Sequence, residues 1–327
     1  MMPIRLLTFT KGAKLPDIPG NSLFHSVELF HIYENTPRYD PILMVAYDGN
    51  RPVAKLLAVI GKSNRWLPGS WTRRCQVYEP GEYFDNNIDK AKLFGMMLNH
   101  LTNLVLPNTF IIEFRNITEP LFAYKEFRNN HYFPLNWMRV YISLHSKDPE
   151  ERLYASRKRQ IQKGFANGAT VKTADSIKEV KLFVAMLKRI YSSKILRHLP
   201  DINFFIQLIK LNTEKENARL FIVSYKEKII GGSLCAFSNG TAYLWFSGGM
   251  RKTHKIQYPG VLAVWAAINY SYEHNYQHFE FMNVGVPYRL HGYREFILHF
   301  GGKERSTRRW FRFRWNWLNK LATWFYL

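Results

Sequence analysis

The sequence predicts two tandem α/β (α+β) lobes with mixed, largely antiparallel sheets. Its 327 residues, 46% of them hydrophobic, suit two globular domains of about 160 residues each. The same order of expected elements occurs twice along the chain, and two short segments recur in matching register. Together these observations favour a duplicated fold over one large domain.

Each half of the chain begins its sheet with a β-hairpin. In the first half, the turn Asp48-Gly49-Asn50 separates strands expected over 42–47 and 53–60. The second half repeats the hairpin and adds a third strand, over 220–225, 229–237 and 241–247. Both halves therefore predict antiparallel meanders.

A helix and a short buried strand follow each meander. Apolar residues at helical spacing predict a helix over 90–105, which leads into a strand over 110–114. Pro259 stands near the first turn of the next expected helix, over 259–272, which leads into a strand over 279–282. Hairpins joined to a helix and a further strand place each lobe in the α/β or α+β class.

Two matched pairs of segments support a duplication. Glu113-Phe114-Arg115-Asn116 parallels Glu280-Phe281-Met282-Asn283, and Tyr124-Lys125-Glu126-Phe127 parallels Tyr293-Arg294-Glu295-Phe296. The separations are 280 − 113 = 167 and 293 − 124 = 169 residues, which agree with a single duplication. An alternating strand is expected to close each half, over 139–144 and 309–315.

Polar residues around Lys147-Asp148-Pro149 mark the expected domain boundary. We place the first lobe at residues 1–147, the second at 148–315, and an amphipathic, Trp-rich tail at 316–327. The apolar residues of the tail share one helical face: Trp317, Leu318, Leu321, Trp324 and Phe325. Such a helix beside basic residues suits an anionic bilayer interface, and packing against the body of the protein is the alternative.

The charge of the chain limits the classes of partner. Lys and Arg number 46 against 25 acidic residues, a formal net charge of +21. This excess favours nucleic acid, an anionic membrane surface or a phosphorylated substrate, although a basic surface that serves only solubility is the simpler alternative. Cys75 and Cys235 form neither a disulfide framework nor a metal-ligand spacing, so we expect no metal. With no signal-peptide pattern or long apolar run, we expect a cytoplasmic protein, or one peripheral to the inner face of the membrane.

The motifs of the second half resemble those of the FemAB-like peptidyltransferases and related GNAT (N-acetyltransferase-like) proteins of cell-envelope biosynthesis. The resemblance is best from about Tyr154 to Glu304, and four segments carry it: 157–163, Gln257-Tyr258-Pro259-Gly260, Phe279-Glu280-Phe281 and 293–302. It implies two tandem GNAT-like domains. It also implies an N-acyltransferase that acts on a cell-envelope, peptidoglycan or polysaccharide precursor at the cytoplasmic face.

The same resemblance concerns the donor. It implies acyl-CoA, acyl carrier protein or aminoacyl-tRNA as a co-substrate, with no tightly bound cofactor. Ile297 stands where the family commonly has Lys, which tilts the expected donor away from aminoacyl-tRNA. In related enzymes a Q/R-x-x-G-x-G/A loop at a helix N-terminus binds the coenzyme A pyrophosphate through backbone N–H groups and the helix dipole. Gln257 and Gly260 match this pattern, and Gln257, Tyr258, Gly260 and Val261 are the residues expected to bind the donor.

The donor loop departs from the family pattern in two places. Pro259 has no N–H to donate, and Leu262 stands where a small residue is expected. An ordinary helix start, without donor contact, is therefore the alternative for this loop.

Polar residues at and after the strand around Glu280 are the candidates for chemistry and acceptor binding. Acyl transfer needs a deprotonated amine and a stabilised oxyanion, and we assign Glu280, Asn283 and Tyr293 to catalysis. Glu280, where the family usually has Asp, acts as base or orients the amine, and an ion pair with an arginine, as expected for its twin Glu113, is the alternative. Tyr288, Arg289 and Arg294 are candidates for binding a phosphate or carboxylate of the acceptor, with His291 beside them.

Two further functions remain open at this point. Because the donor motifs are incomplete, the chain could be a catalytically degenerate tandem-GNAT protein that binds an anionic lipid-linked glycan or RNA. Charge and aromatic content alone would also fit an RNA-binding protein, tRNA included, whose affinity falls steeply with salt.

Overall fold

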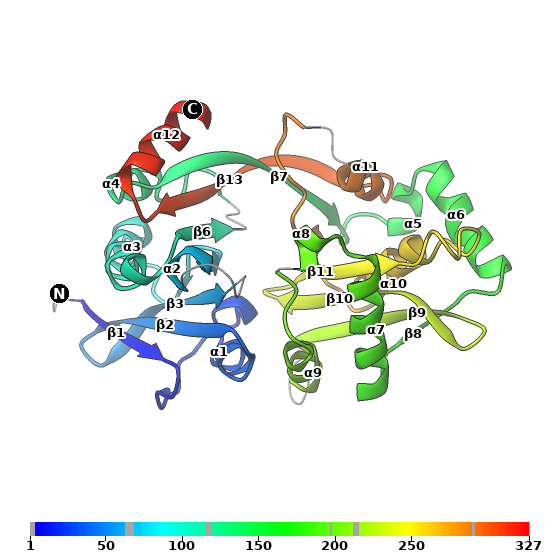
Figure 1. The fold of residues 1–327 in the computed structure, drawn as a ribbon, viewed down its shortest axis with the longest axis horizontal. Helices are drawn as coiled ribbons and strands as arrows, with labels where there is room; N and C mark the ends of the chain where they lie inside the picture. The colour runs from blue at the N-terminus through cyan, green and yellow to red at the C-terminus, as the bar shows by residue number, and fades with distance from the viewer. Residues whose placement is uncertain are drawn as a thin grey trace. The chain divides into compact units, whose positions relative to one another are not determined.

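The computed structural model describes residues 4–62, 69–115, 119–196, 198–211, 216–289 and 292–326. The chain folds into two compact units (Figure 1). Unit 1 comprises Met1–Trp137 and Ser306–Leu327, and unit 2 comprises Met138–Arg305. Each unit contains part of one continuous path of paired strands and has its own apolar core.

Unit 1 is built around a sheet in the order β1-β2-β3-β4-β6-β13-β7, with β5 paired to β3. Its strands are β1 (Arg5–Thr10), β2 (Tyr39–Asp48), β3 (Arg51–Lys62), β4 (Arg73–Tyr78), β5 (Glu82–Tyr83), β6 (Ile111–Arg115), the first part of β7 (Phe133–Ser143) and most of β13 (Lys303–Phe313). Its helices are α1 (Val27–Glu34), α2 (Gly69–Thr72), α3 (Lys90–Val105), α4 (Tyr124–Asn129) and α12 (Asn316–Tyr326), with short 3-10 turns at Leu23–His25 and Leu106–Asn108.

The local structure of unit 1 follows from its turn and cap residues. The predicted hairpin turn joins β2 to β3, and Gly49 adopts the left-handed conformation that this tight turn requires. Asp89 caps α3, because its carboxylate accepts the Lys92 N–H at 3.0 Å. The buried face of α3 then packs on a core in which the rings of Phe127 and Trp310 stack 4.5 Å apart.

Unit 2 has a sheet in the order β7-β12-β11-β10-β9-β8. Its strands are the last part of β7, β8 (Thr170–Thr173), β9 (Ala218–Tyr225), β10 (Lys228–Ser238), β11 (Thr241–Gly249) and β12 (His278–Phe281). Its helices are α5 (Pro149–Arg152), α6 (Ala155–Ala166), α7 (Ile177–Ile190), α8 (Ser193–Leu196), α9 (Ile202–Lys210), α10 (Pro259–Glu273) and α11 (Gly292–Leu298). Only β11 and β12 run parallel among its paired strands; the other pairs are antiparallel.

Two adjacent glycines of β10 show how helices cover both faces of this sheet. A Cβ on Gly231 would lie 2.8 Å from the Pro259 carbonyl oxygen of α10, and one on Gly232 would lie 2.8 Å from the Phe183 ring of α7. Because neighbouring strand residues point to opposite faces, α7 and α10 lie on opposite sides of β10 (Figure 1). This sheet with a helix on each face confirms the predicted fold class.

The duplication is visible in the order of the elements. In unit 1, α3 leads into β6 and then α4; in unit 2, α10 leads into β12 and then α11. The repeated segments thus fall on equivalent elements, with Glu113 on β6 and Glu280 on β12. Asn116, the last residue of the first matched segment, lies outside the described residues.

The strands that close the two halves are shared between the units. β7 begins in unit 1 and ends in unit 2, whereas β13 begins in unit 2 and ends in unit 1. The compact units therefore divide inside these strands, after Trp137 and after Arg305, and α12 belongs to unit 1. The domains predicted from the sequence, 1–147 and 148–315 with a tail at 316–327, describe the two halves of the duplication. These bounds stay a prediction.

None of the helices in the described ranges is both long and apolar enough to cross a bilayer.

Candidate active site

The two parallel strands of unit 2 separate halfway along their length. β11 pairs with β12 only between Thr241–Leu244 and His278–Phe281, and β11 then continues to Gly249. A β-bulge lies at this point, because Leu234 of β10 faces Phe246 and Cys235 faces Leu244, so Trp245 is an extra residue. A bulge redirects a strand and often lies beside a functional site. The edge of β11 over residues 245–249, described throughout, is thus not paired to β12.

The end of β11 lies against the start of α10 through backbone contacts. A Cβ on Gly249 would lie 2.3 Å from the Gly260 nitrogen and 2.8 Å from its Cα. Only a glycine at position 249 permits this approach. Tyr258, immediately before the helix, adopts a left-handed conformation with φ 47°, and Pro259 is the first helical residue, as predicted.

Helix α6 fixes the loop that precedes α10. The Asn167 side-chain amide donates to the Ile256 carbonyl at 3.0 Å. A Cβ on Gly164 would lie 2.8 Å from the Gln257 carbonyl oxygen and 2.9 Å from Cδ1 of Leu262, and both Gln257 and Leu262 are buried. Leu262 therefore packs into the core against α6, which explains why a large residue is tolerated where the family pattern has a small one.

Two backbone N–H groups in the first turn of α10 donate within the turn itself. The Val261 and Leu262 N–H groups both donate to the Tyr258 carbonyl, at 2.9 and 3.1 Å, and Pro259 has no N–H. The Gly260 amide takes no part in these two bonds. The position that a Cβ of Gly260 would occupy has the Gly249 nitrogen as its nearest heavy atom, at 3.9 Å, so there is space beside this turn. The turn therefore has space on the Cβ side of Gly260, with fewer free N–H donors than the family pattern offers.

Glu280 lies on β12 in a two-point ion pair. Nε and Nη2 of Arg139, on β7, donate to its two carboxylate oxygens at 2.8 and 2.5 Å, and the Glu280 side chain is buried. This geometry favours the structural alternative, in which the pair holds β7 and β12 together. The role of Glu280 as base or amine-orienting group stays a prediction.

The twin carboxylate in unit 1 has the same type of partner. Glu113 accepts from Nη1 of Arg309 at 2.9 Å and from Nη2 of Arg115 at 2.6 Å. Burial alone would raise the pKa of Glu113, but the charges of Arg115 and Arg309 outweigh burial and lower that pKa to about 2. Ion pairing of this position in both halves indicates a shared structural requirement of the duplicated fold.

Arg294 stabilises the loop after β12. Its guanidinium donates to the carbonyls of Val286 and Arg289, both at 2.9 Å, and of Pro287 at 3.4 Å, and it contacts Glu304 at 3.3 Å. A buried guanidinium with these partners holds the loop 286–289 in place. Binding of the acceptor by Arg294 stays a prediction, and these contacts favour an indirect role in which Arg294 positions the loop.

The remaining predicted residues lie around that loop. Tyr288 and Arg289 are exposed on it, and Asn283 is an exposed residue in a left-handed conformation just after β12. Tyr293, in the first turn of α11, is half-buried, and burial raises the pKa of its phenol. His291 lies outside the described residues. Unit 2 therefore contains all ten predicted site residues: Gln257, Tyr258, Gly260, Val261, Glu280, Asn283, Tyr288, Arg289, Tyr293 and Arg294.

Arg157 of α6 has a role that the sequence reasoning missed. It is buried, with its guanidinium carbon 4.5 and 4.4 Å from the ring centres of Phe296 and Phe300, and its Nη2 donates to the Phe296 carbonyl at 2.6 Å. Burial lowers its pKa to about 10. Arg157 thus anchors α11 to α6 through cation–π contacts. In the sequence, the four-residue spacing of Phe296 and Phe300 was the feature that could have indicated a shared partner for these two rings.

Unit 1 has no comparable opening in its described residues. β4 and β6 are parallel and pair along their whole length, Arg74–Tyr78 with Ile111–Arg115, and the Glu79 N–H continues the pairing to the Arg115 carbonyl at 2.8 Å. A groove of about 710 Å³ does lie on unit 1, between α3 and α4, with Asn99, Asn103 and Asn130 in its lining. It contains none of the predicted site residues.

Comparisons with known proteins agree with this architecture. Residues 152–290 match the sequence model of the acetyltransferase (GNAT) domain. Among solved structures, FemX superposes with a TM-score of 0.62 at 11% identity, covering 93% of this chain and 95% of FemX. A tandem GNAT protein from the clavulanic acid biosynthesis pathway superposes at 0.53 and 12% identity, covering 86% and 85%. L-PGS from Bacillus licheniformis gives 0.53 at 10% identity, covering 82% and 86%. No curated protein matches the sequence.

At these identities the structural similarities concern the fold. The chain therefore shares the tandem GNAT fold over nearly its whole length, and residues 152–290 carry a GNAT domain. The opening between β11 and β12 lies within that matched segment.

Proposed function

We propose that this chain, in which residues 152–290 form a GNAT domain, is an N-acyltransferase that acts on a cell-envelope precursor at the cytoplasmic face. It would transfer an acyl or aminoacyl group to an amine of a peptidoglycan or polysaccharide precursor. The observation that carries the proposal is the separation of β11 from β12 at the bulge of Trp245. A strand edge that the neighbouring strand has left offers backbone N–H and C=O groups at fixed positions, which suits an extended donor with amide groups.

The donor site combines this edge with the start of α10. Main-chain groups of β11 after the bulge would bind the arm of the donor, apart from the Ser247 and Gly249 carbonyls, which accept from the Tyr191 hydroxyl and the Arg251 N–H. The Gly260 amide, at the positive end of the α10 dipole, would face the phosphates of the donor. An acyl-CoA and an acyl carrier protein share a phosphopantetheine arm, so either fits the same edge. Gln257 and Tyr258 would position the loop, while the Val261 N–H is used within the helix turn.

The reaction would join the acceptor nitrogen to the acyl carbon and break the bond between that carbon and the leaving sulfur or oxygen. The proton that the amine nitrogen loses would pass, directly or through solvent, to that leaving group. Burial raises the pKa of Tyr293, which makes its phenol a weaker acid, so Tyr293 would act as a hydrogen-bond donor to the leaving group or the oxyanion rather than as a strong general acid. Asn283, exposed just after β12, would bind the acceptor or the oxyanion. Glu280, bound by Arg139, would act mainly by positioning β12.

The acceptor would carry negative charge. Arg289 and Tyr288 are exposed on the loop after β12, and the chain carries a net charge of +21. An exposed guanidinium matches phosphate or carboxylate in two-point geometry. FemX and L-PGS share this fold. Their similarity is a further reason to test envelope acceptors, and to test aminoacyl-tRNA as a donor beside acyl-CoA.

A catalytically degenerate binding protein for an anionic lipid-linked glycan or RNA is the second candidate. It is favoured by the ion-paired Glu280, by the internal use of the Val261 N–H, and by Ile297, which is fully buried where the family commonly has a lysine. Mass spectrometry of purified protein incubated with acyl-CoA or aminoacyl-tRNA and an envelope-precursor extract separates the two. An acylated amine product supports the enzyme; its absence with every donor supports the binding protein.

Replacing Gly260 with alanine tests the donor site. The methyl group fits the protein itself, so the melting temperature should stay the same or rise slightly. We expect donor affinity, measured by titration calorimetry with acyl-CoA, to fall at least tenfold, because the methyl fills the space that a phosphate would enter.

The matched control is Gly292→Ala at the start of α11, where a Cβ meets no heavy atom within 4 Å. It should leave donor affinity unchanged. Equal donor affinity of Gly260→Ala and the unaltered protein would contradict a donor site at this turn.

A further inference from the structure

We propose that the exposed face of α12, together with the aromatic and basic residues beside it in unit 1, binds the surface of an anionic lipid bilayer. This inference goes beyond the transfer reaction and does not depend on it. It concerns a surface formed by α12, Trp71 and Trp315, referred to below as the aromatic face.

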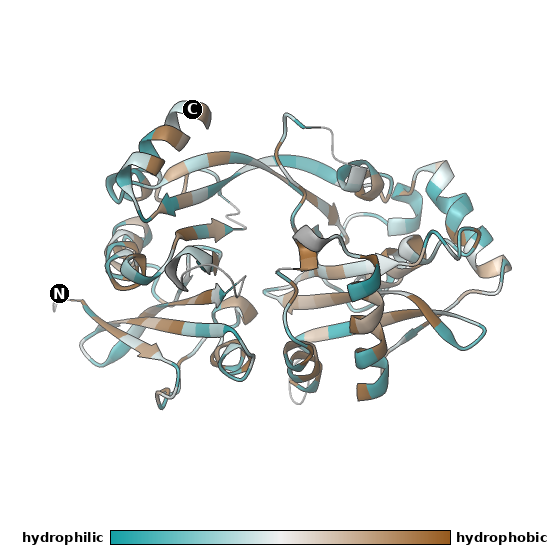
Figure 2. Cartoon of the chain, viewed as in Figure 1, coloured by the Kyte–Doolittle hydropathy of each residue, from teal (hydrophilic) through white to brown (hydrophobic). Residues whose placement is uncertain are grey.

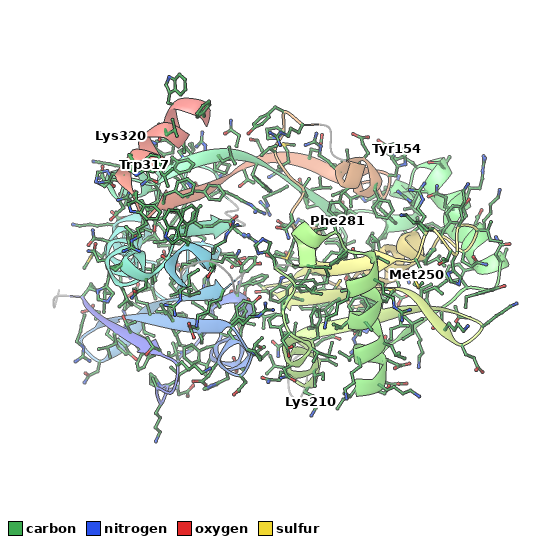
Figure 3. All side chains as sticks on the ribbon, viewed as in Figure 1. Tyr154, Lys210, Met250, Phe281, Trp317 and Lys320 are labelled. Carbon is green, nitrogen blue, oxygen red and sulfur yellow. The ribbon has the colours of Figure 1, made fainter. Side chains whose placement is uncertain are left out.

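Four apolar side chains of α12 are exposed on one side of the helix. Their exposed fractions are 62% for Trp317, 44% for Leu321, 76% for Trp324 and 67% for Phe325. The spacing i, i+4, i+7 and i+8 places them on a single face. Figure 2 shows hydrophobic bands on α12, and Figure 3 labels Trp317 and Lys320 near its beginning.

The helix is held firmly in unit 1, so its exposed side has a defined position. Asn319, which is buried, accepts the Phe313 N–H at 2.7 Å and donates to the carbonyls of Phe313 and Trp315 at 3.0 and 3.2 Å. Nη2 of Arg312 donates to the Asn316 side chain at 2.8 Å. These bonds fix the first turns of α12 to the end of β13, with Trp317 and Trp324 pointing away from the core.

A second aromatic group includes Trp315, the residue immediately before α12. The ring of Trp71, 52% exposed, lies 4.6 Å from the ring of Trp315, and both rings lie 5.9 Å from that of Phe110. Exposed indoles prefer the interface between water and lipid, where the ring is apolar and the N–H is solvated. Isolated apolar residues on a surface need no explanation, but four exposed apolar side chains on one helix face, next in sequence to the Trp315 cluster, indicate an interaction site.

The charges around this face favour anionic lipid over a neutral partner. Residues 306–326 of unit 1 contain five basic residues and no acidic one, and three of the five, Arg308, Arg314 and Lys320, are not buried. Lys320 is exposed on α12, Arg74 is exposed at the start of β4, and the Arg314 guanidinium lies 5.7 Å from the Trp315 ring centre. Basic residues next to an apolar helix face are the combination that binds anionic bilayer surfaces.

Binding of the full chain to vesicles tests this proposal. Co-sedimentation would compare vesicles of phosphatidylcholine alone with vesicles that contain 30% phosphatidylglycerol. We expect at least tenfold stronger binding to the anionic vesicles, with a decline as salt is raised. Failure to bind either vesicle would overturn the proposal.

Variants of the aromatic face locate the contact. Trp324→Ser with Phe325→Ser is expected to weaken binding to the anionic vesicles at least tenfold at an unchanged melting temperature. Lys320→Glu should weaken binding to the anionic vesicles only. The control pair Ile177→Ser with Leu182→Ser removes two apolar side chains of α7 in unit 2 that are 43% and 47% exposed, and it should leave binding intact.

Two results would assign the surface differently. Unchanged vesicle binding by the Trp324 and Phe325 double variant would overturn the role of α12. The second result combines two findings: the chain does not bind vesicles, and sedimentation velocity without lipid shows a dimer that dissociates in the same double variant. This result would assign the aromatic face to contact with a second copy of the chain.

Discussion

Replacing Glu280 with alanine is expected to lower the free energy of unfolding by about 3–5 kcal/mol, because it removes one partner of a buried ion pair. Arg139 donates to both oxygens of Glu280, and its guanidinium would stay largely buried without that carboxylate. The pair joins β7 to β12, at the start of the strand separation. Chemical denaturation followed by circular dichroism measures the effect, with Glu295→Ala, an exposed acid on α11, as the control.

A double variant separates structure from chemistry at this position. Arg139→Met with Glu280→Leu removes both charges and fills the space with apolar atoms, so most of the lost stability should return. If Glu280 serves to position β12, this double variant retains acyl transfer. Recovered stability with abolished transfer would contradict that role and assign Glu280 to the reaction itself.

Replacing Gly249 with alanine is expected to reduce acyl transfer at least 100-fold. The new Cβ would lie 2.3 Å from the Gly260 nitrogen and 2.9 Å from the Pro259 carbonyl carbon, and backbone atoms at this distance must move. The end of β11 and the start of α10 would then separate. Because these two segments form the proposed donor site, a displacement of about 1 Å is enough to disrupt the reacting geometry.

Stability distinguishes a local effect from general unfolding. Overpacking at Gly249 should cost about 1–3 kcal/mol, too little to unfold a chain that retains normal stability elsewhere. Gly61→Ala in β3 of unit 1 is the matched control, since its nearest neighbour is the movable ring of Tyr39, at 3.2 Å. A folded Gly249→Ala protein with full transfer activity would show that the donor does not bind at this junction.

The sequence predicted the elements of the fold well, because the signals are local. Asp48-Gly49-Asn50 sets a turn, Pro259 starts a helix, and the helical spacing over 90–105 predicted α3. The two matched pairs of segments predicted an internal duplication, and the structure places them on equivalent elements, β6 and α4 in unit 1 and β12 and α11 in unit 2. The sequence did not predict that β7 and β13 each contribute residues to both units. The partner of a strand depends on long-range pairing, which the residues of the strand alone do not determine.

The sequence predicted which segment carries the candidate site, but it did not predict the contacts that form it. The motif after Gln257 correctly indicated the start of α10, yet the bulge at Trp245 and the close approach of Gly249 to Gly260 arise from tertiary contacts. Similarly, Arg294 and Arg157 were visible as basic residues, but their partners, loop carbonyls and the rings of Phe296 and Phe300, are set by packing. Charged residues in a motif are therefore ambiguous until their partners are known.

Hydrogen–deuterium exchange of the full chain, with and without donor, tests most directly whether unit 2 holds the donor site. The probes are acetyl-CoA and an aminoacyl-tRNA mixture. With at least one of them, the account predicts slower exchange over residues 245–262, the end of β11 and the start of α10. Exchange should stay unchanged over 78–95, the corresponding part of unit 1 at the repeat separation of 167 residues. Protection of the unit 1 segment alone, or of neither segment with either probe, would contradict it.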